Sequence, residues 1–147
     1  MIVSWTLRIA TATALGIDAV VHWQNASAYD AVRGSISQGQ LFRAEAAVAV
    51  VVGLLVLVRP RPSSWLAALL VGASALAAVL LYRYVDVGAV GPLPEMYENT
   101  WQVPGKLLSA YAEAAAVVLA TLGLLTHRPH SRMEPLIPLG AIRRKRG

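Results

Sequence analysis

The amino-acid sequence predicts an all-α protein, a bundle of four transmembrane helices, and two observations lead to this prediction. Hydrophobic residues make up 56% of the 147 residues and charged residues only 14%, with a mean hydropathy of +0.55. Soluble domains usually carry about 25% charged residues, so the composition argues against both a water-soluble globule and a disordered chain. The second observation is a series of four apolar stretches, each close to the roughly 20 residues that a helix needs to cross a bilayer.

The first stretch, residues 3–24, carries Arg8, Asp18 and His22 as its ionisable side chains. A cleaved signal peptide is an alternative for this stretch, because small residues follow Arg8. The uninterrupted apolar run is short, however, and Asp18 follows it directly. We therefore expect the first helix to remain in the protein. The second stretch, residues 41–58, carries its charged side chains near its start.

The third and fourth stretches are the clearest transmembrane predictions. Residues 64–84 contain no charge before Arg83, and residues 105–126 contain Glu113 as the one charge after Lys106. Small residues also recur four positions apart in these stretches, which favours close packing of helices in lipid.

Proline residues mark the breaks between the stretches. The sequence Arg59-Pro-Arg-Pro62 predicts a very short turn and an antiparallel hairpin of the second and third helices. Residues 88–105 cannot continue a helix. Within them, residues 91–105 predict an outer loop that is either a lid over the bundle or, as we favour, a segment at the lipid headgroups. The 1–126 domain is followed by residues 127–147, which predict a basic, disordered cytoplasmic tail.

The distribution of basic residues predicts a multi-pass protein of the plasma membrane with both termini in the cytoplasm. Arg8, the turn at residues 59–62 and the basic tail fall on one side if the chain crosses four times. The lipid bilayer is then the first expected partner, and other membrane proteins or a second copy remain open. We assign the basic tail to topology or to anionic lipids, and we expect no nucleic-acid partner.

The candidate site is a group of polar side chains in the outer half of the predicted bundle. Ionisable groups cost roughly 2.5–3.5 kcal/mol at the centre of a membrane helix, so they usually face the bundle interior and find partners. Asp18 and His22 are four residues apart and share a helix face. The predicted ligand-binding residues are Asp18, His22, Glu45, Tyr82, Arg83 and Glu113.

Three roles for this group remain open. The side chains could fix the register of the helices, for example through an ion pair of Glu45 or Glu113 with Arg83. They could bind a small molecule or a metal, because carboxylates and imidazole suit zinc or manganese. They could form a path for protons or a solute, although no ionisable group continues it through the inner half of the spans.

The sequence excludes several chemistries. With no cysteine, the chain can form no disulfide, thiol nucleophile or cysteine-ligated cluster. Haem held by two histidines is not expected, because His127 and His130 follow the last span. No nucleotide-binding or hydrolase motif is present, so we predict no catalytic residue, and the sequence identifies no cofactor or particular metal.

Three short segments suggest a resemblance to known membrane proteins. They are Asp18-Ala-Val-Val-His22-Trp23, Leu41-Phe-Arg-Ala-Glu45 and Tyr111-Ala-Glu113. The chain resembles small four-helix integral membrane proteins of actinobacteria, many of them uncharacterised, and more distantly the DoxX-like architecture. This resemblance implies, as an alternative, an accessory role in redox or quinone-linked membrane complexes.

The function expected from the sequence is that of a structural or accessory membrane subunit, without enzymatic activity. The first alternative is a small-molecule or metal-binding membrane protein, including a redox or quinone-linked one. Its ligand would bind in an outward-facing pocket formed by the polar side chains of the candidate site. The second alternative is a small transporter.

Overall fold

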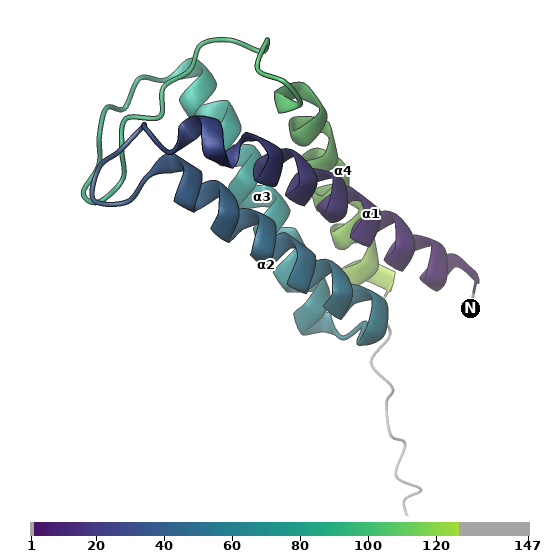
Figure 1. Ribbon diagram of the computed structural model, residues 1–147. Coiled ribbons are helices and arrows are strands. Elements are labelled where there is room, and N and C mark those ends of the chain that lie inside the picture. Colours follow the sequence, from purple (N-terminus) through teal and green to yellow (C-terminus); the bar gives the residue numbers. More distant parts are fainter. Residues whose placement is uncertain (1, 127–147) are drawn as a thin grey trace, which may run out of the picture.

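The structure is a computed structural model that describes residues 2–126, and all its long elements are helices (Figure 1). The helices are α1 (Ile2–Asn25), α2 (Gln38–Val58), α3 (Pro62–Tyr84) and α4 (Lys106–Thr126), with a short 3-10 helix η1 (Ala26–Tyr29) after α1. These residues include no β-strand. The predicted tail, residues 127–147, and its two histidines lie outside the described residues. The all-α prediction is therefore confirmed for the described part of the chain.

The helix boundaries agree with the predicted spans to within a few residues, and local chemistry explains the differences. Helix α2 begins at Gln38 rather than at residue 41, because Ser37 and Gln40 form a capping box. The Ser37 hydroxyl accepts from the Gln40 backbone amide, and the Gln40 side chain accepts from the Ser37 amide. Helix α3 begins at Pro62, whose missing N–H needs no partner in the first helical turn.

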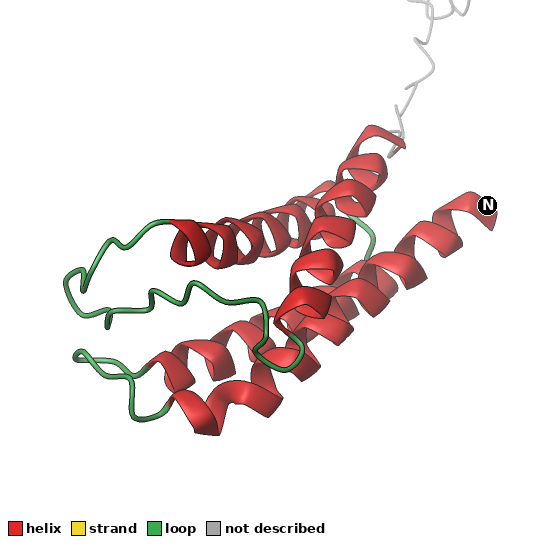
Figure 2. Ribbon diagram, turned by 90° about the horizontal axis from the view of Figure 1, so that it is seen from above, coloured by secondary structure: helices red, strands yellow, loops and turns green. Residues whose placement is uncertain are grey.

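The four helices pack side by side in an order that differs from their order in the chain. Helix α1 packs against α2 and α4, and α3 packs mainly against α4 and less extensively against α2. The α1–α2 and α3–α4 connections lie together at one end of the molecule, at the left in Figure 1. The short α2–α3 turn and the first residues of α1 lie at the opposite end, as the view from above also shows (Figure 2).

Small side chains form most of the contacts between helices. Ala49, Ala68, Ala116 and Ala120 are fully buried, and Leu15 is the largest apolar side chain among the fully buried ones. Alanine lets helix backbones approach closely, so that dispersion contacts are made along the full length of the helices. The predicted close packing of small residues is thus seen at these contacts.

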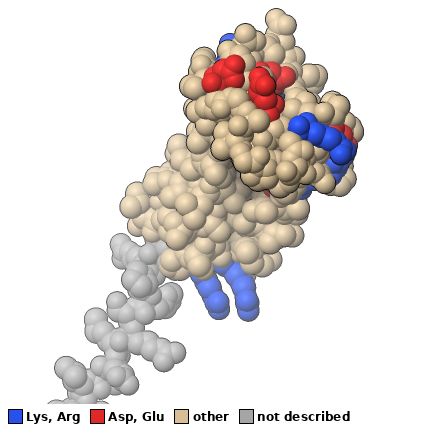
Figure 3. Space-filling model, turned by 90° about the vertical axis from the view of Figure 1, so that its left-hand side faces the viewer, with Lys and Arg blue, Asp and Glu red and all other residues tan. Residues whose placement is uncertain are grey.

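Three of the helices, α2, α3 and α4, are long and apolar enough to cross a membrane. Their outer faces expose large apolar side chains such as Leu54, Leu70 and Val118, each more than half exposed. Such surface is unfavourable in water and suits lipid. In Figure 3, acidic side chains gather at one end of the visible face together with some basic ones, basic side chains alone project at the other end, and the surface between them is largely uncharged. The chain therefore has the character of a membrane protein.

Helix α1 is as long as the others but less apolar, and it is not among the helices that are apolar enough to cross a membrane. Polar residues, including Arg8, Thr11 and Asp18, interrupt its apolar sequence. Thr11 and Asp18 are buried against the other helices, so these two polar groups face the protein interior.

Candidate functional site

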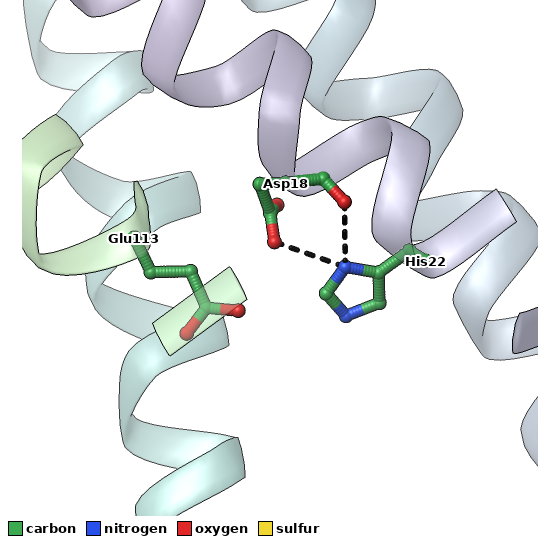
Figure 4. A group of neighbouring side chains, drawn as sticks. All are labelled: Asp18, His22 and Glu113. Atoms are coloured by element: carbon green, nitrogen blue, oxygen red, sulfur yellow. Dashed lines mark hydrogen bonds and ion pairs between the residues drawn. The ribbon is translucent and has the colours of Figure 1, made fainter. Parts of the chain in front are cut away.

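Asp18 and His22 contact each other on the side of α1 that faces α4 (Figure 4). The Nδ1 atom of His22 lies 2.9 Å from a carboxylate oxygen of Asp18 and 3.1 Å from the Asp18 backbone carbonyl. A backbone carbonyl can only accept, so Nδ1 carries the hydrogen and donates it to both oxygens. The Nε2 atom is then the nitrogen that remains for another partner.

Ser109 joins Asp18 to Glu113, which lies one turn further along α4. The Ser109 hydroxyl oxygen lies 2.6 Å from Asp18 Oδ1 and 3.0 Å from Glu113 Oε1. A hydroxyl has one hydrogen and can donate to only one carboxylate at a time. The second short contact therefore requires a proton on one of the two carboxyl groups. All three side chains are at least 96% buried, with exposed fractions of 1%, 4% and 2% for Asp18, Ser109 and Glu113.

Three carboxylate oxygens in this region are buried without a hydrogen-bond partner in the described part of the chain. They are Asp18 Oδ2, Glu113 Oε2 and Glu45 Oε1. Glu45 reaches the site from α2 and is close enough to interact electrostatically with Asp18 and His22. Leaving a buried acceptor unpaired costs about 1–3 kcal/mol, and more when it is charged, so these atoms mark a place where a partner would be stabilising.

A cavity of about 420 Å³ lies beside these groups. Helices α1, α2, α3 and α4 all contribute to its walls, together with residues of the α3–α4 connection. His22, Glu45, Ser109 and Glu113 line it, and most of the remaining wall is apolar, including Phe42. The ring of Phe42 meets the His22 imidazole edge-on, with ring centroids 5.1 Å apart, and so restricts its rotation.

The long α3–α4 connection, residues 85–105, closes against the cavity. Glu98 accepts a hydrogen bond of 2.7 Å from the Tyr29 hydroxyl and forms an ion pair of 3.1 Å with Lys106. Its backbone amide donates to the Tyr82 carbonyl. These contacts of Glu98 join the connection to η1, α3 and α4. Tyr29, Glu98 and Lys106 also line the cavity. Burial, with the carboxylate of Glu98 beside it, raises the pKa of the Tyr29 hydroxyl well above its ordinary value.

The α1–α2 connection is held by a second ion pair. Both terminal nitrogens of Arg43 donate to the Asp30 carboxylate at 2.7 Å. The Arg43 guanidinium holds the pKa of Asp30 below its usual value, so the carboxylate stays charged. The backbone amide of Ile36 also donates to the Pro92 carbonyl, so the two connections contact each other near the cavity.

The structure brings together five of the six residues predicted to bind a ligand. Tyr82 and Glu45 line the cavity beside His22 and Glu113, and Asp18 lies directly behind them. Arg83 does not line it. Its guanidinium lies over the rings of Tyr84 and Trp101, at 5.0 and 5.6 Å from their centroids.

The ion pair suggested for Arg83 with Glu45 or Glu113 is not formed among residues 2–126. Consecutive helical residues point in different directions, and here Tyr82 faces the cavity whereas Arg83 points toward Tyr84 and Trp101.

Sequence reasoning missed Tyr29, Phe42 and Glu98 as residues of the cavity wall. Ser109 is not among the predicted ligand-binding residues, although the sequence places it with Lys106 and Glu113 on one stripe of the last helix. Tyr29 and Glu98 belong to irregular segments, in which no periodicity indicates the direction of a side chain.

The arrangement can bind a cation or a hydrogen-bond donor at its carboxylates and an apolar group along its walls. Comparison with known proteins adds no assignment, since no family model, curated protein or solved structure matches this chain.

Proposed function

We propose that this protein is an integral membrane protein that binds a small amphipathic molecule in the cavity between its four helices. The observation that supports this proposal is a largely apolar cavity of about 420 Å³ that is bordered by Glu45, Glu113 and His22. Ligand pockets of proteins commonly enclose about 300–1,000 Å³ and combine apolar walls with a few polar groups.

In this proposal all four helices cross the plasma membrane, and both termini are cytoplasmic. Helix α1 packs against α2 and α4, and its buried Thr11 and Asp18 face protein rather than lipid. A helix of this length with its polar groups turned inward can cross a bilayer as part of a four-helix transmembrane bundle. The cavity then lies toward the outer side of the membrane, beneath the connection of residues 85–105.

The chemistry of the cavity defines the class of ligand. A cationic or hydrogen-bond-donating head group would pair with Oε1 of Glu45, which lacks a partner within the described residues. An apolar body would lie along the helix walls and along Met96 and Val103 of the covering segment. A lipid amine and a free amphipathic amine share this chemistry.

A purely structural or accessory role, which the sequence alone favoured, fits this geometry less well. Polar groups that only hold helices together would be expected to pair with one another. Here Glu45 makes no hydrogen bond through Oε1, and Arg83 is turned toward aromatic rings instead of a carboxylate, as far as the described residues show. A transporter would need a continuous polar path, and no observation favours one.

The proposal is tested by native mass spectrometry of gently extracted protein, using a variant that fills the cavity. Ala78 lines the cavity and Ala77, its neighbour on α3, does not. We expect the wild type and Ala77→Phe to retain the same bound mass in a one-to-one ratio, and Ala78→Phe to lose it. Fragmentation of the retained species distinguishes a lipid amine from a free metabolite.

Two results would contradict binding in the cavity. One is a wild-type protein that carries only a variable number of bulk lipids. The other is a bound mass that Ala78→Phe and Ala77→Phe retain equally. Either result would favour a structural or accessory role instead.

A further inference from the structure

We propose that Asp18, His22 and Glu113 form a binding site for one divalent transition-metal ion where α1 meets α4. This inference goes beyond the amphipathic ligand proposed above and does not depend on it, because the three residues would hold the ion without an organic molecule. Figure 4 shows the three side chains directed toward a common region, two from α1 and one from α4.

The spacing of the three side chains suits a metal ion. One potential ligand atom of each residue lies within 4.8 Å of the corresponding atoms of the other two. Ligands at about 2.0–2.2 Å from a zinc ion stand roughly 3.4 Å apart in a tetrahedral site and at most about 4.4 Å apart otherwise. Small rotations of the side chains would therefore bring all three ligand atoms to bonding distance.

Asp18 and Glu113 are each held through one oxygen and offer the other. Asp18 Oδ1 and Glu113 Oε1 contact Ser109, whereas Asp18 Oδ2 and Glu113 Oε2 are buried and unpartnered within residues 2–126. The Nδ1 atom of His22 lies 2.9 Å from Asp18 Oδ1 and is therefore the imidazole nitrogen beside the carboxylates. An ion bound at Nδ1 would replace the hydrogen there, and Nε2 would carry the ring hydrogen instead. Metal-binding side chains are typically oriented in this way by hydrogen bonds from their non-coordinating atoms.

The unpartnered oxygens are the observation that separates a metal site from an ordinary acidic cluster. They belong to side chains that are 1% and 2% exposed, so solvent cannot reach them freely. Two adjacent buried carboxylates repel each other unless a proton or a cation lies between them. A divalent cation that replaces this proton would partner both oxygens at once and balance both charges.

The ligand types indicate the class of metal. One imidazole nitrogen and two carboxylate oxygens suit Mn²⁺, Fe²⁺ or Zn²⁺, whereas Ca²⁺ and Mg²⁺ prefer oxygen alone. The absence of cysteine from the sequence removes the thiolates that favour copper(I). Glu45, which faces the same cavity from α2, is placed to contribute a further oxygen or to balance charge.

Metal titration of the full-length protein in detergent, after chelator treatment, tests this inference. Manganese(II) is added and the free ion is followed by its electron paramagnetic resonance signal, and Zn²⁺ is then used to displace it. We expect one Mn²⁺ per chain. Glu113→Gln and His22→Gln should weaken the binding at least tenfold. Glu95→Gln, which removes an exposed loop carboxylate, should leave it unchanged.

Thermal unfolding gives a second readout, in which the response of the wild type does not depend on any variant. Zinc should raise the unfolding temperature of the wild type, and it should raise that of folded Asp18→Asn much less. A wild type that neither binds Mn²⁺ nor is stabilised by Zn²⁺ would overturn the inference. So would variants at position 113 or 22 that bind as tightly as Glu95→Gln. Only the metal is added in these experiments. A negative result therefore says nothing about the amphipathic ligand, which is tested separately by native mass spectrometry.

Discussion

At the scale of single residues, Ser109 is the side chain on which the geometry of the acidic group depends. Its hydroxyl contacts both Asp18 and Glu113, and all three are buried between α1 and α4. Interhelical hydrogen bonds in membrane proteins contribute about 0.6–1.7 kcal/mol, and removal of one partner leaves the other unsatisfied. Ser109 thus positions the two carboxylates as well as connecting the helices.

We expect Ser109→Ala to destabilise the protein by about 1–2 kcal/mol, because Asp18 Oδ1 and Glu113 Oε1 would lose their shared hydroxyl. Thermal unfolding in detergent measures the effect. Ser74→Ala is the matched control, since Ser74 is exposed and bonds only to a carbonyl of its own helix. Equal losses of stability in the two variants would show that the buried hydroxyl has no special role.

Tyr29 gives the protein a defined response to alkaline pH. Its folded-state pKa is raised, so the folded state holds the phenolic proton more tightly than the unfolded state does. The resulting stability is fully present below the unfolded pKa of about 10, and it is lost as the pH rises from there toward the raised folded pKa.

We expect Tyr29→Phe to cost about 1 kcal/mol at neutral pH through the lost hydrogen bond to Glu98. The same variant should also show a shallower loss of stability above pH 10, as measured by unfolding at a series of pH values. Tyr97→Phe, at an exposed position of the same connection, serves as the control. The mechanism would be wrong if both variants kept the full alkaline slope of the wild type.

At the scale of helices, close packing depends on glycines that face neighbouring side chains. A Cβ atom at Gly123 on α4 would overlap the indole ring of Trp65 on α3. A Cβ atom at Gly16 on α1 would meet no atom within 4 Å. The two glycines therefore have different roles, although both lie inside long helices.

We expect Gly123→Ala to destabilise the protein by about 1–3 kcal/mol, because α3 and α4 must separate or Trp65 must move. Gly16→Ala should be neutral or slightly stabilising, since alanine favours helix more than glycine by up to about 1 kcal/mol. Paired thermal unfolding curves measure both effects. A similar change in both variants would contradict the close contact between Trp65 and Gly123.

The helices could be predicted from the sequence because length and apolar content are sufficient to identify them. The shared face of Asp18 and His22 could be predicted as well, since the helical repeat fixes it. Arg83 shows the limit of reasoning from depth alone, because its side chain points to Tyr84 and Trp101 rather than to the cavity. The Tyr29–Glu98–Lys106 group could not be predicted, because it depends on how two irregular connections meet.

At the scale of the whole molecule, the cavity and the first residues of α1 lie at opposite ends of the helices, so the location of one end fixes the location of the other. The α1–α2 and α3–α4 connections share one end with the cavity, and the α2–α3 turn lies at the other end (Figure 1). A single accessible residue at each end is therefore enough to determine the orientation of all four helices. The lack of cysteine makes any introduced thiol the only one in the chain.

We expect Ser35→Cys to react with a membrane-impermeant maleimide in intact cells and Ser63→Cys to react only after permeabilisation. Both serines are exposed, Ser35 in the α1–α2 connection and Ser63 at the start of α3 beside the short turn. The basic residues near Ser63, Arg59 and Arg61, favour the cytoplasmic side for that turn. The reverse labelling pattern would place the cavity on the cytoplasmic side. Any ligand or metal would then reach Glu113 from inside the cell.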